Sequence, residues 1–217
     1  MNWVDIVLLV LLVAAVIIGS KKGLVRELMA LAVLTATVIV SVNYIDIIAT
    51  KIYAKVGGSP LVVAILSFIV LLAFIYAIFK LLGLLFYRIA NLQKLGKKDQ
   101  VGGAIVGAIR GWIVISFMIF LVFLIPMPEK FYVDFDNSFL GVAFAKTVPA
   151  IYESSTGLHP KSTNFMQKVE NTLIQQAPPR NSRVGRSDIG QTREQVYRVI
   201  YQIDRFFGTG DQPQRRI

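Results

Sequence analysis

Residues 61–87 read LVVAILSFIVLLAFIYAIFKLLGLLFY, an apolar run of 27 residues in which Lys80 carries the one charge. A helix of this length reaches about 40 Å, which exceeds the roughly 30 Å hydrocarbon core of a bilayer. Ser59 and Pro60 precede the run and are typical of a helix start, where a capping hydroxyl is followed by proline. Lys80 lies near one end, where its long side chain can reach the membrane interface. The run therefore predicts a helix that spans a membrane.

The same apolar character recurs in three other blocks before Pro126, and short charged connectors separate them. Apolar residues make up 55% of the chain and charged residues 17%; a soluble protein would scatter its apolar residues at helix or strand spacing instead of gathering them in blocks. We therefore expect an all-α, polytopic membrane protein with four short transmembrane helices. The expected spans, within a module of residues 1–126, are about 2–19, 27–43, 60–87 and 101–125.

The cations of this module lie mainly in the first and third connectors and predict its orientation. The first connector carries three Lys or Arg residues and the third carries four, whereas the two lysines of the second are offset by Asp46. Cytoplasmic loops are enriched in Lys and Arg, so the first and third connectors are expected inside the cell and both termini outside.

Residues 1–5 lack the positive region of a signal peptide, which predicts a retained first helix. The amphipathic stretch 43–58 is expected to lie in the plane of the interface.

The chain beyond Pro126 is polar and is expected to form a partly helical C-terminal tail. We interpret residues 127–176 as a juxtamembrane helical segment, residues 177–191 as a flexible linker rich in Pro, Arg, Ser and Gly, and residues 192–217 as an amphipathic helix with a disordered end. A capping-box pattern at 192–195 predicts the start of that helix. Its apolar stripe consists of Val196, Ile200, Ile203 and Phe207. Such a stripe needs a partner, which can be the membrane surface, another protein or the bundle of the same chain.

Gly103, Gly107 and Gly111 recur at intervals of four in the fourth expected helix. At this spacing the glycines line one face and let a second backbone approach closely, which is a main source of packing energy in lipid. We interpret the face as an internal helix-packing surface, with a homodimer interface as the alternative.

Arg110 of the same helix is the charge that is hardest to place in a bilayer. It is expected at or just inside the cytoplasmic boundary, either reaching to the interface or paired with Glu27, which enters the membrane from the same side. Asp99 precedes the helix and is expected to cap it. Asp5 lies near the opposite end of the first helix; we interpret it as solvated at the outer face, with a place in a polar path as the alternative.

Residue types that support catalysis or metal binding are scarce. The chain has no cysteine and a single histidine, His159, so disulfides, thiol chemistry and Cys- or His-ligated metal sites are not expected. Paired carboxylates, or Ser and His groups facing each other at depth, are not evident. The net charge is +10, but the sequence has no polar stretch in which basic and aromatic residues alternate, as a nucleic-acid-binding surface would require. We expect no enzymatic activity, no cofactor, no metal and no nucleic-acid partner.

Two motifs stand at a specific mutual spacing. Trp-Val-Asp at 3–5 opens a short first helix, and Lys-Gly-x-x-Arg-Glu follows at 22–27. Asp-x-x-x-Gly-x-x-x-Gly-x-x-Arg-Gly occupies residues 99–111. Together these motifs resemble the colicin V production protein family of bacterial inner-membrane proteins, over about residues 1–150. The residues that carry the resemblance are Asp5, Gly19, Gly23, Arg26, Glu27, Asp99, Gly103, Gly107, Arg110 and Gly111.

The resemblance implies a four-helix membrane module associated with production of a secreted peptide toxin and with envelope homeostasis. Some similar proteins join this module to an extracytoplasmic serine protease domain. The tail of this chain departs from that pattern, because it has no Gly-x-Ser-x-Gly, and about ninety mostly linker-like residues cannot supply a protease fold around His159.

The leading functional hypothesis is a non-enzymatic membrane component that supports toxin export or envelope integrity by engaging partners. The expected partners are the lipid bilayer and membrane or envelope proteins, with a second copy of the chain among the candidates. The alternative is a small solute or ion transporter or channel subunit, in which Arg110, Glu27 and Asp5 line a polar path.

Overall fold

The computed structural model describes residues 2–56, 60–90, 96–154, 164–175 and 186–208, and this part of the chain contains no strand. Four helices come first, namely α1 (Trp3–Lys22), α2 (Leu24–Val56), α3 (Pro60–Ala90) and α4 (Lys97–Phe123). Five further helices follow, namely α5 (Glu129–Asp136), α6 (Phe139–Ala145), α7 (Thr147–Ser154), α8 (Phe165–Gln175) and α9 (Arg186–Phe207). The expected all-α class is confirmed.

Four helical segments are long and apolar enough to cross a bilayer, as predicted: α1, Leu24–Ile45 of α2, Leu61–Ile78 of α3, and α4. Their outward faces carry large exposed apolar side chains, for example Val10 on α1, Phe74 on α3 and Ile105 on α4. A continuous apolar surface of this kind is unfavourable in water and suited to contact with lipid.

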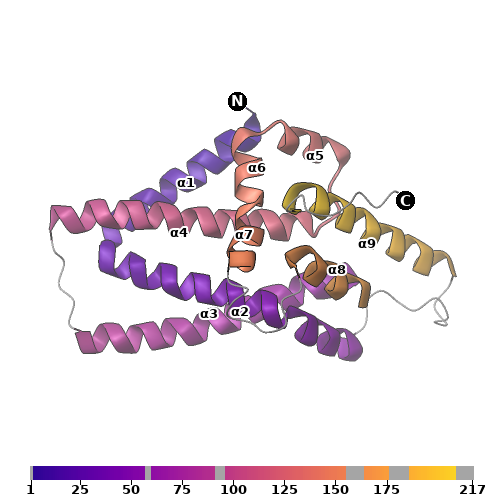
Figure 1. The fold of residues 1–217 in the computed structure, drawn as a ribbon, viewed down its shortest axis with the longest axis horizontal. Coiled ribbons are helices and arrows are strands. Elements are labelled where there is room, and N and C mark those ends of the chain that lie inside the picture. The colour runs from indigo at the N-terminus through magenta and orange to yellow at the C-terminus, as the bar shows by residue number, and fades with distance from the viewer. Residues whose placement is uncertain (1, 57–59, 91–95, 155–163, 176–185, 209–217) are drawn as a thin grey trace.

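The four long helices pack in the order α1, α4, α2, α3 rather than in chain order (Figure 1). α1 runs along α4 in the opposite direction; α4 also packs on α2, and α2 packs on α3. The turn between α1 and α2, the end of α3 and the start of α4 all lie at one end of the bundle (Figure 1). The elements that flank the two strongly basic connectors therefore come together.

The second half of α2 extends beyond the expected span of residues 27–43. Residues 43–56 continue α2, which is a single helix of 33 residues, so this stretch is not a separate element; its position in the plane of the interface stays a prediction. Ile45 and Ala49 are buried and extend, at helical spacing, the buried face that begins with Val38 and Val42. This face packs against α3 and keeps the whole segment in one helix.

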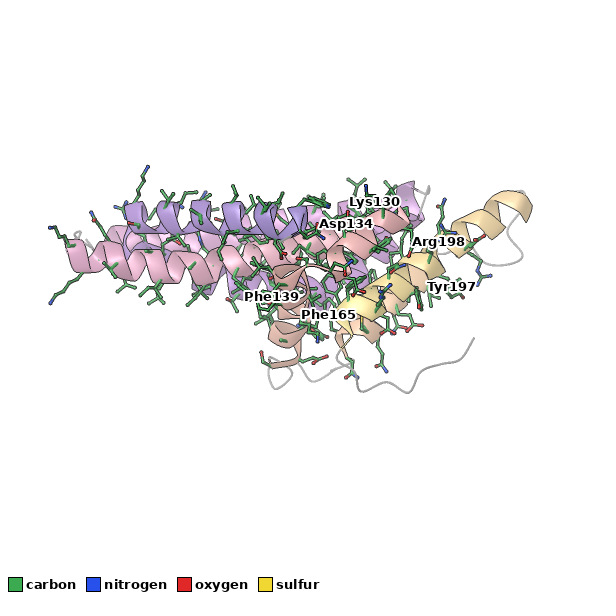
Figure 2. The ribbon with its side chains drawn as sticks, turned by 90° about the horizontal axis from the view of Figure 1, so that it is seen from above. Lys130, Asp134, Phe139, Phe165, Tyr197 and Arg198 are labelled. Atoms are coloured by element: carbon green, nitrogen blue, oxygen red, sulfur yellow. The ribbon has the colours of Figure 1, made fainter. Side chains whose placement is uncertain are left out.

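The tail folds back onto the bundle, with α6 and α7 lying across α4 (Figures 1 and 2). Trp112 of α4 stacks on Phe144 of α6 at a centroid distance of 3.9 Å, and its indole N–H donates a hydrogen bond of 2.8 Å to Thr147 Oγ1. An indole with one apolar and one hydrogen-bonded contact is well suited to such a junction. These contacts fasten α6 and α7 to the middle of α4.

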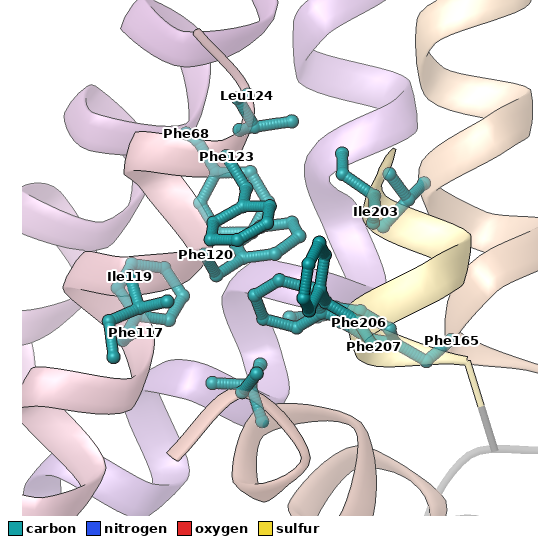
Figure 3. Close-up of a cluster of buried hydrophobic side chains, with 14 of the residues drawn as sticks. Phe68, Phe117, Ile119, Phe120, Phe123, Leu124, Phe165, Ile203, Phe206 and Phe207 are labelled. Atoms are coloured by element: carbon teal, nitrogen blue, oxygen red, sulfur yellow. The ribbon is translucent and has the colours of Figure 1, made fainter. Parts of the chain in front are cut away.

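A buried aromatic cluster joins α4 to the last two helices (Figure 3). The ring of Phe165 in α8 lies 5.3 Å from that of Phe120, and the rings of Phe206 and Phe207 in α9 lie 5.1 and 5.3 Å from that of Phe123. Full burial of one such side chain contributes about 1.5–3 kcal/mol, and edge-to-face geometry adds to it. α8 and α9 are therefore part of the folded core.

The amphipathic helix of the tail packs on its own chain, which settles one of the alternatives left open by the sequence. Val196, Ile203 and Phe207 of the expected stripe are buried and Ile200 is half-buried.

The predicted start of this helix, a capping box at residues 192–195, is wrong, because α9 begins at Arg186. Residues 186–191 had been assigned to the linker. They contain no proline, and a helix tolerates the one glycine at a cost of about 1 kcal/mol. The rest of the expected linker, the expected disordered end and His159 lie outside the described residues.

Candidate functional site

The three glycines of α4 form the contact surface for α1. A Cβ atom added to Gly103 would lie 2.6 Å from the carbonyl oxygen of Gly19, and one added to Gly107 would lie 2.7 Å from Gly19 Cα. At Gly111 the corresponding neighbour is the Cβ of Ala15, at 2.3 Å. At Gly103 and Gly107 the two backbones approach too closely for any side chain, and at Gly111 the methyl group of Ala15 occupies the space that a side chain would need. The glycine face of α4 thus contacts α1 within the chain, as an internal packing surface would.

Asp99 caps a helix, but not the one that was expected. α4 begins two residues earlier, at Lys97, so Asp99 lies in its first turn. Its Oδ1 accepts a hydrogen bond of 2.8 Å from the backbone N–H of Leu24, the first residue of α2. Gly23 makes the turn between α1 and α2 with φ of +88°, and a Cβ there would lie 2.2 Å from Asp99 Oδ2. The turn therefore needs glycine both for its backbone conformation and for the space that the carboxylate occupies.

Glu27 and Arg110 meet as a buried ion pair, which was one of the two expected arrangements. Arg110 Nε lies 2.8 Å from Glu27 Oε2, and Lys22 Nζ lies 3.8 Å from Oε1. The Glu27 side chain is fully buried, whereas that of Arg110 is 18% exposed. Neither carboxylate oxygen forms a well-aligned hydrogen bond to Arg110 Nε, so the pair is held by charge rather than by directed bonding.

Asp5 holds a second polar cluster at the other end of α1. Its Oδ1 accepts hydrogen bonds from the hydroxyl of Ser138 at 2.6 Å and the backbone N–H of Leu140 at 2.9 Å. Its Oδ2 accepts one from the backbone N–H of Asn2 at 3.2 Å. The Ser138 hydroxyl in turn accepts from the backbone N–H of Gly141 and caps α6. Asp5 is only 5% exposed, so the expectation of a solvated carboxylate is wrong.

The partners of Asp5 are not evident from the sequence. Ser138 stands just before an apolar heptapeptide, which is the usual position of a helix-capping hydroxyl, so its presence at a helix start was detectable. The hydrogen bond from Ser138 to Asp5, which lies 133 positions earlier in the chain, could not be detected in this way.

The two polar clusters do not combine into one path among the described residues. Asp5 and Lys22 lie near opposite ends of α1, about 25 Å apart at 1.5 Å per residue. On the face of α1 toward α4, the positions between them are apolar or small, for example Leu8, Ala15 and Gly19. The structure thus brings Arg110 and Glu27 together and leaves Asp5 apart from them. In the same part of the chain, no group of three or more His, Cys, Asp or Glu residues is placed to hold a metal ion.

Removal of the Asp5 carboxylate is expected to loosen the start of α6. Asp5→Ala leaves the Ser138 hydroxyl and the Leu140 N–H without their buried acceptor, at about 1–3 kcal/mol for each buried group left unpaired. We expect amide hydrogen exchange at residues 138–141 to accelerate, with little change around the α1–α2 turn. Substitution of the exposed Asp136 by alanine is the control, and equal exchange rates in the two variants would contradict the role of Asp5.

These features define a class of protein, namely a polytopic α-helical membrane protein with a glycine-packed helix pair, a buried ion pair and a buried, hydrogen-bonded carboxylate. The chain matches the family model described as "Colicin V production protein" over residues 4–149, and it belongs to that family. The matched region contains Asp5, the Glu27–Arg110 ion pair and the three glycines of α4 that contact α1, and it ends before α8. No curated protein and no solved structure matches the chain.

Proposed function

We propose that this chain is a non-enzymatic component of the bacterial cytoplasmic (inner) membrane that supports toxin production or export, or envelope homeostasis, by engaging a partner protein. The observation that carries the proposal is the corner between α5 and α6. There Phe139 is 87% exposed, while the residues on either side of it are both hydrogen-bonded to the buried Asp5.

Hydrogen bonds hold the α5–α6 corner around Phe139 in a fixed conformation. Asp5 binds the side-chain hydroxyl of Ser138 and the backbone N–H of Leu140 on either side of Phe139. The indole N–H of Trp3 donates a hydrogen bond of 2.8 Å to Asp134 Oδ2 in α5. A large apolar side chain on a preorganised backbone loses little conformational entropy when a partner covers it. Figure 2 marks Phe139 on the flank of the molecule from which α6 and α7 project.

The two polar clusters, at Asp5 and at Glu27, favour a structural role over transport. Each carboxylate already has its partners within the fold, and the clusters stand at opposite ends of α1. A transport path would need ionisable groups that continue through the bundle and can exchange partners with a solute. The contacts of each carboxylate instead hold neighbouring helices in position.

The orientation is also part of the proposal. The basic residues of the α1–α2 turn and of the start of α4 lie at one end of the bundle, and the positive-inside tendency places that end in the cytoplasm. The N-terminus and the α5–α6 corner then face outward, together with the C-terminus. A partner at Phe139 would belong to the extracytoplasmic side.

Photo-crosslinking in native membranes tests the proposal. A benzophenone amino acid at position 139 of the full chain is expected to yield a discrete protein adduct. The same group at Val10, exposed on the apolar outer face of α1, is expected to react mainly with lipid. Phe139→Ser should change folding stability by less than about 0.5 kcal/mol, because the side chain is exposed. It should nevertheless fail to restore toxin secretion or detergent tolerance in cells that lack the protein, while Tyr197→Ser restores them.

Two results would overturn this function. One is full complementation by Phe139→Ser together with identical adducts at positions 139 and 10. The other is a solute or ion flux through vesicles that contain the purified protein, abolished by Arg110→Ala without unfolding; that flux would favour the transporter alternative.

A further inference from the structure

Each of the four long helices contributes one cation to the wall of a single cavity of about 420 Å³. The cations are Lys22 of α1, Arg26 of α2, Lys80 of α3 and Arg110 of α4. The volume lies within the range of roughly 300–1,000 Å³ that is usual for ligand sites. Neither the predicted ion pair nor the proposed partner surface accounts for this convergence of positive charge.

The described carboxylates near these cations are those of Glu27 and Asp99. Glu27 lies buried beside the cavity, within 2.8 Å of Arg110 and 3.8 Å of Lys22. The carboxylate of Asp99, in the first turn of α4, faces Gly23 and accepts the N–H of Leu24 instead. Among the described residues, the wall of the cavity itself carries four cations and no carboxylate, and a cavity of this sign attracts an anion.

The remaining walls of the cavity are apolar. Met29 and Val33 of α2 and Leu84 of α3 line it, and Tyr76 places its ring 5.8 Å from Lys80 Nζ. Leu84 is itself exposed on the outer surface of α3, so the apolar wall continues onto the surface suited to lipid. A free inorganic anion would gain nothing from these walls, whereas an amphiphile would fill both parts of the site.

We propose that this cavity binds an anionic phospholipid. Its phosphate lies among Lys22, Arg26, Lys80 and Arg110, and its acyl chain lies along Met29, Val33 and Leu84. Basic pockets between transmembrane helices, close to a cation-rich membrane face, have the chemistry to recognise such headgroups. A bound lipid would link all four long helices at the end of the bundle where the basic connectors begin. The inference goes beyond the proposed function and is independent of any partner at Phe139, which lies at the other end of α1.

Native mass spectrometry of the full chain in detergent tests the proposal by titration with phosphatidylglycerol and with phosphatidylcholine of identical acyl chains. The wild-type protein is expected to bind the anionic lipid at least about tenfold more tightly, because several cations face one phosphate. Equal affinities for the two lipids would overturn the proposal, and this comparison does not depend on any variant. Inorganic phosphate is titrated in parallel; if it displaces the lipid at comparable concentration, the site is one for a soluble anion and the lipid assignment fails.

A paired set of variants locates the site. Arg26→Gln with Lys80→Gln is expected to weaken binding of phosphatidylglycerol roughly 10- to 30-fold, because each cation near the headgroup contributes about fivefold. Lys130→Gln with Lys146→Gln removes two exposed lysines outside the cavity wall and should leave the affinity unchanged. Equal losses in the two double variants would show attraction to the net charge alone and would overturn the assignment. The melting temperature of each variant checks that it is folded.

Discussion

Replacement of Arg110 with methionine is expected to lower the free energy of unfolding by about 3–5 kcal/mol, the usual cost of breaking a buried ion pair from one side. The substitution leaves the fully buried carboxylate of Glu27 without the guanidinium group that lies 2.8 Å from it. Lys22, at 3.8 Å and about half exposed, can compensate only in part. Unfolding in mixed detergent micelles, followed by circular dichroism, measures the change.

The two sides of the pair should not be equivalent. Glu27→Gln is expected to cost less than Arg110→Met, because the Arg110 side chain is partly exposed and lines the basic cavity, where water can reach it. The double variant removes both charges and should recover most of the loss, since no isolated charge remains buried. Additive losses in the double variant would show that the two residues act separately and would contradict the pair.

Gly103→Ala is expected to destabilise the bundle by about 2 kcal/mol, even though alanine is the better helix former. Its Cβ would lie 2.6 Å from the carbonyl oxygen of Gly19 and 2.7 Å from the carbonyl carbon of Gly23, and neither backbone can rotate away as a side chain can. Overpacking of this severity costs up to about 3 kcal/mol, while the better helix propensity returns about 1 kcal/mol. The same unfolding assay measures the effect.

The adjacent glycine offers a matched control. The three atoms nearest to a Cβ at Gly102 would be the Cβ and the two Cδ atoms of Leu24, at 3.0–3.1 Å, and a shift of a few tenths of an ångström relieves this contact. Gly102→Ala should therefore be neutral or slightly stabilising, through the helix propensity of alanine. If the two alanine variants had the same stability, the close approach of α1 and α4 at Gly103 would be wrong.

Some features of this molecule follow from patterns that are local in the chain. Four apolar blocks predict four membrane helices because block length and composition decide whether a segment suits lipid. Glycines four residues apart predict a close helix contact because they fall on one face whatever lies opposite. The pairing of Glu27 with Arg110 was foreseen as one of two alternatives, since both enter the membrane from the same side. Each inference needs only the periodicity of a helix and the chemistry of a bilayer.

The helix boundaries differ from those that local composition suggests where packing across the chain outweighs it. The stretch 43–58 has the amphipathic pattern of an interfacial helix, yet its apolar face continues the α2 surface that packs on α3. Residues 186–191 have a composition typical of a linker, yet they belong to α9, whose later residues are buried against the bundle. In both segments the burial of a continuous apolar face decides the structure, because packing overrides weak local preferences.

The sequence by itself determined the number of membrane helices, the small-residue face of the fourth and the candidate charges near each membrane boundary, because each is a property of one segment. Only the tertiary structure decided which groups those charges meet. Asp99 accepts a hydrogen bond from a residue 75 positions away, and Asp5 from one 133 positions away. These pairings depend on the order α1, α4, α2, α3 across the bundle, which is set by the sum of many side-chain contacts between helices and by no single motif along the chain.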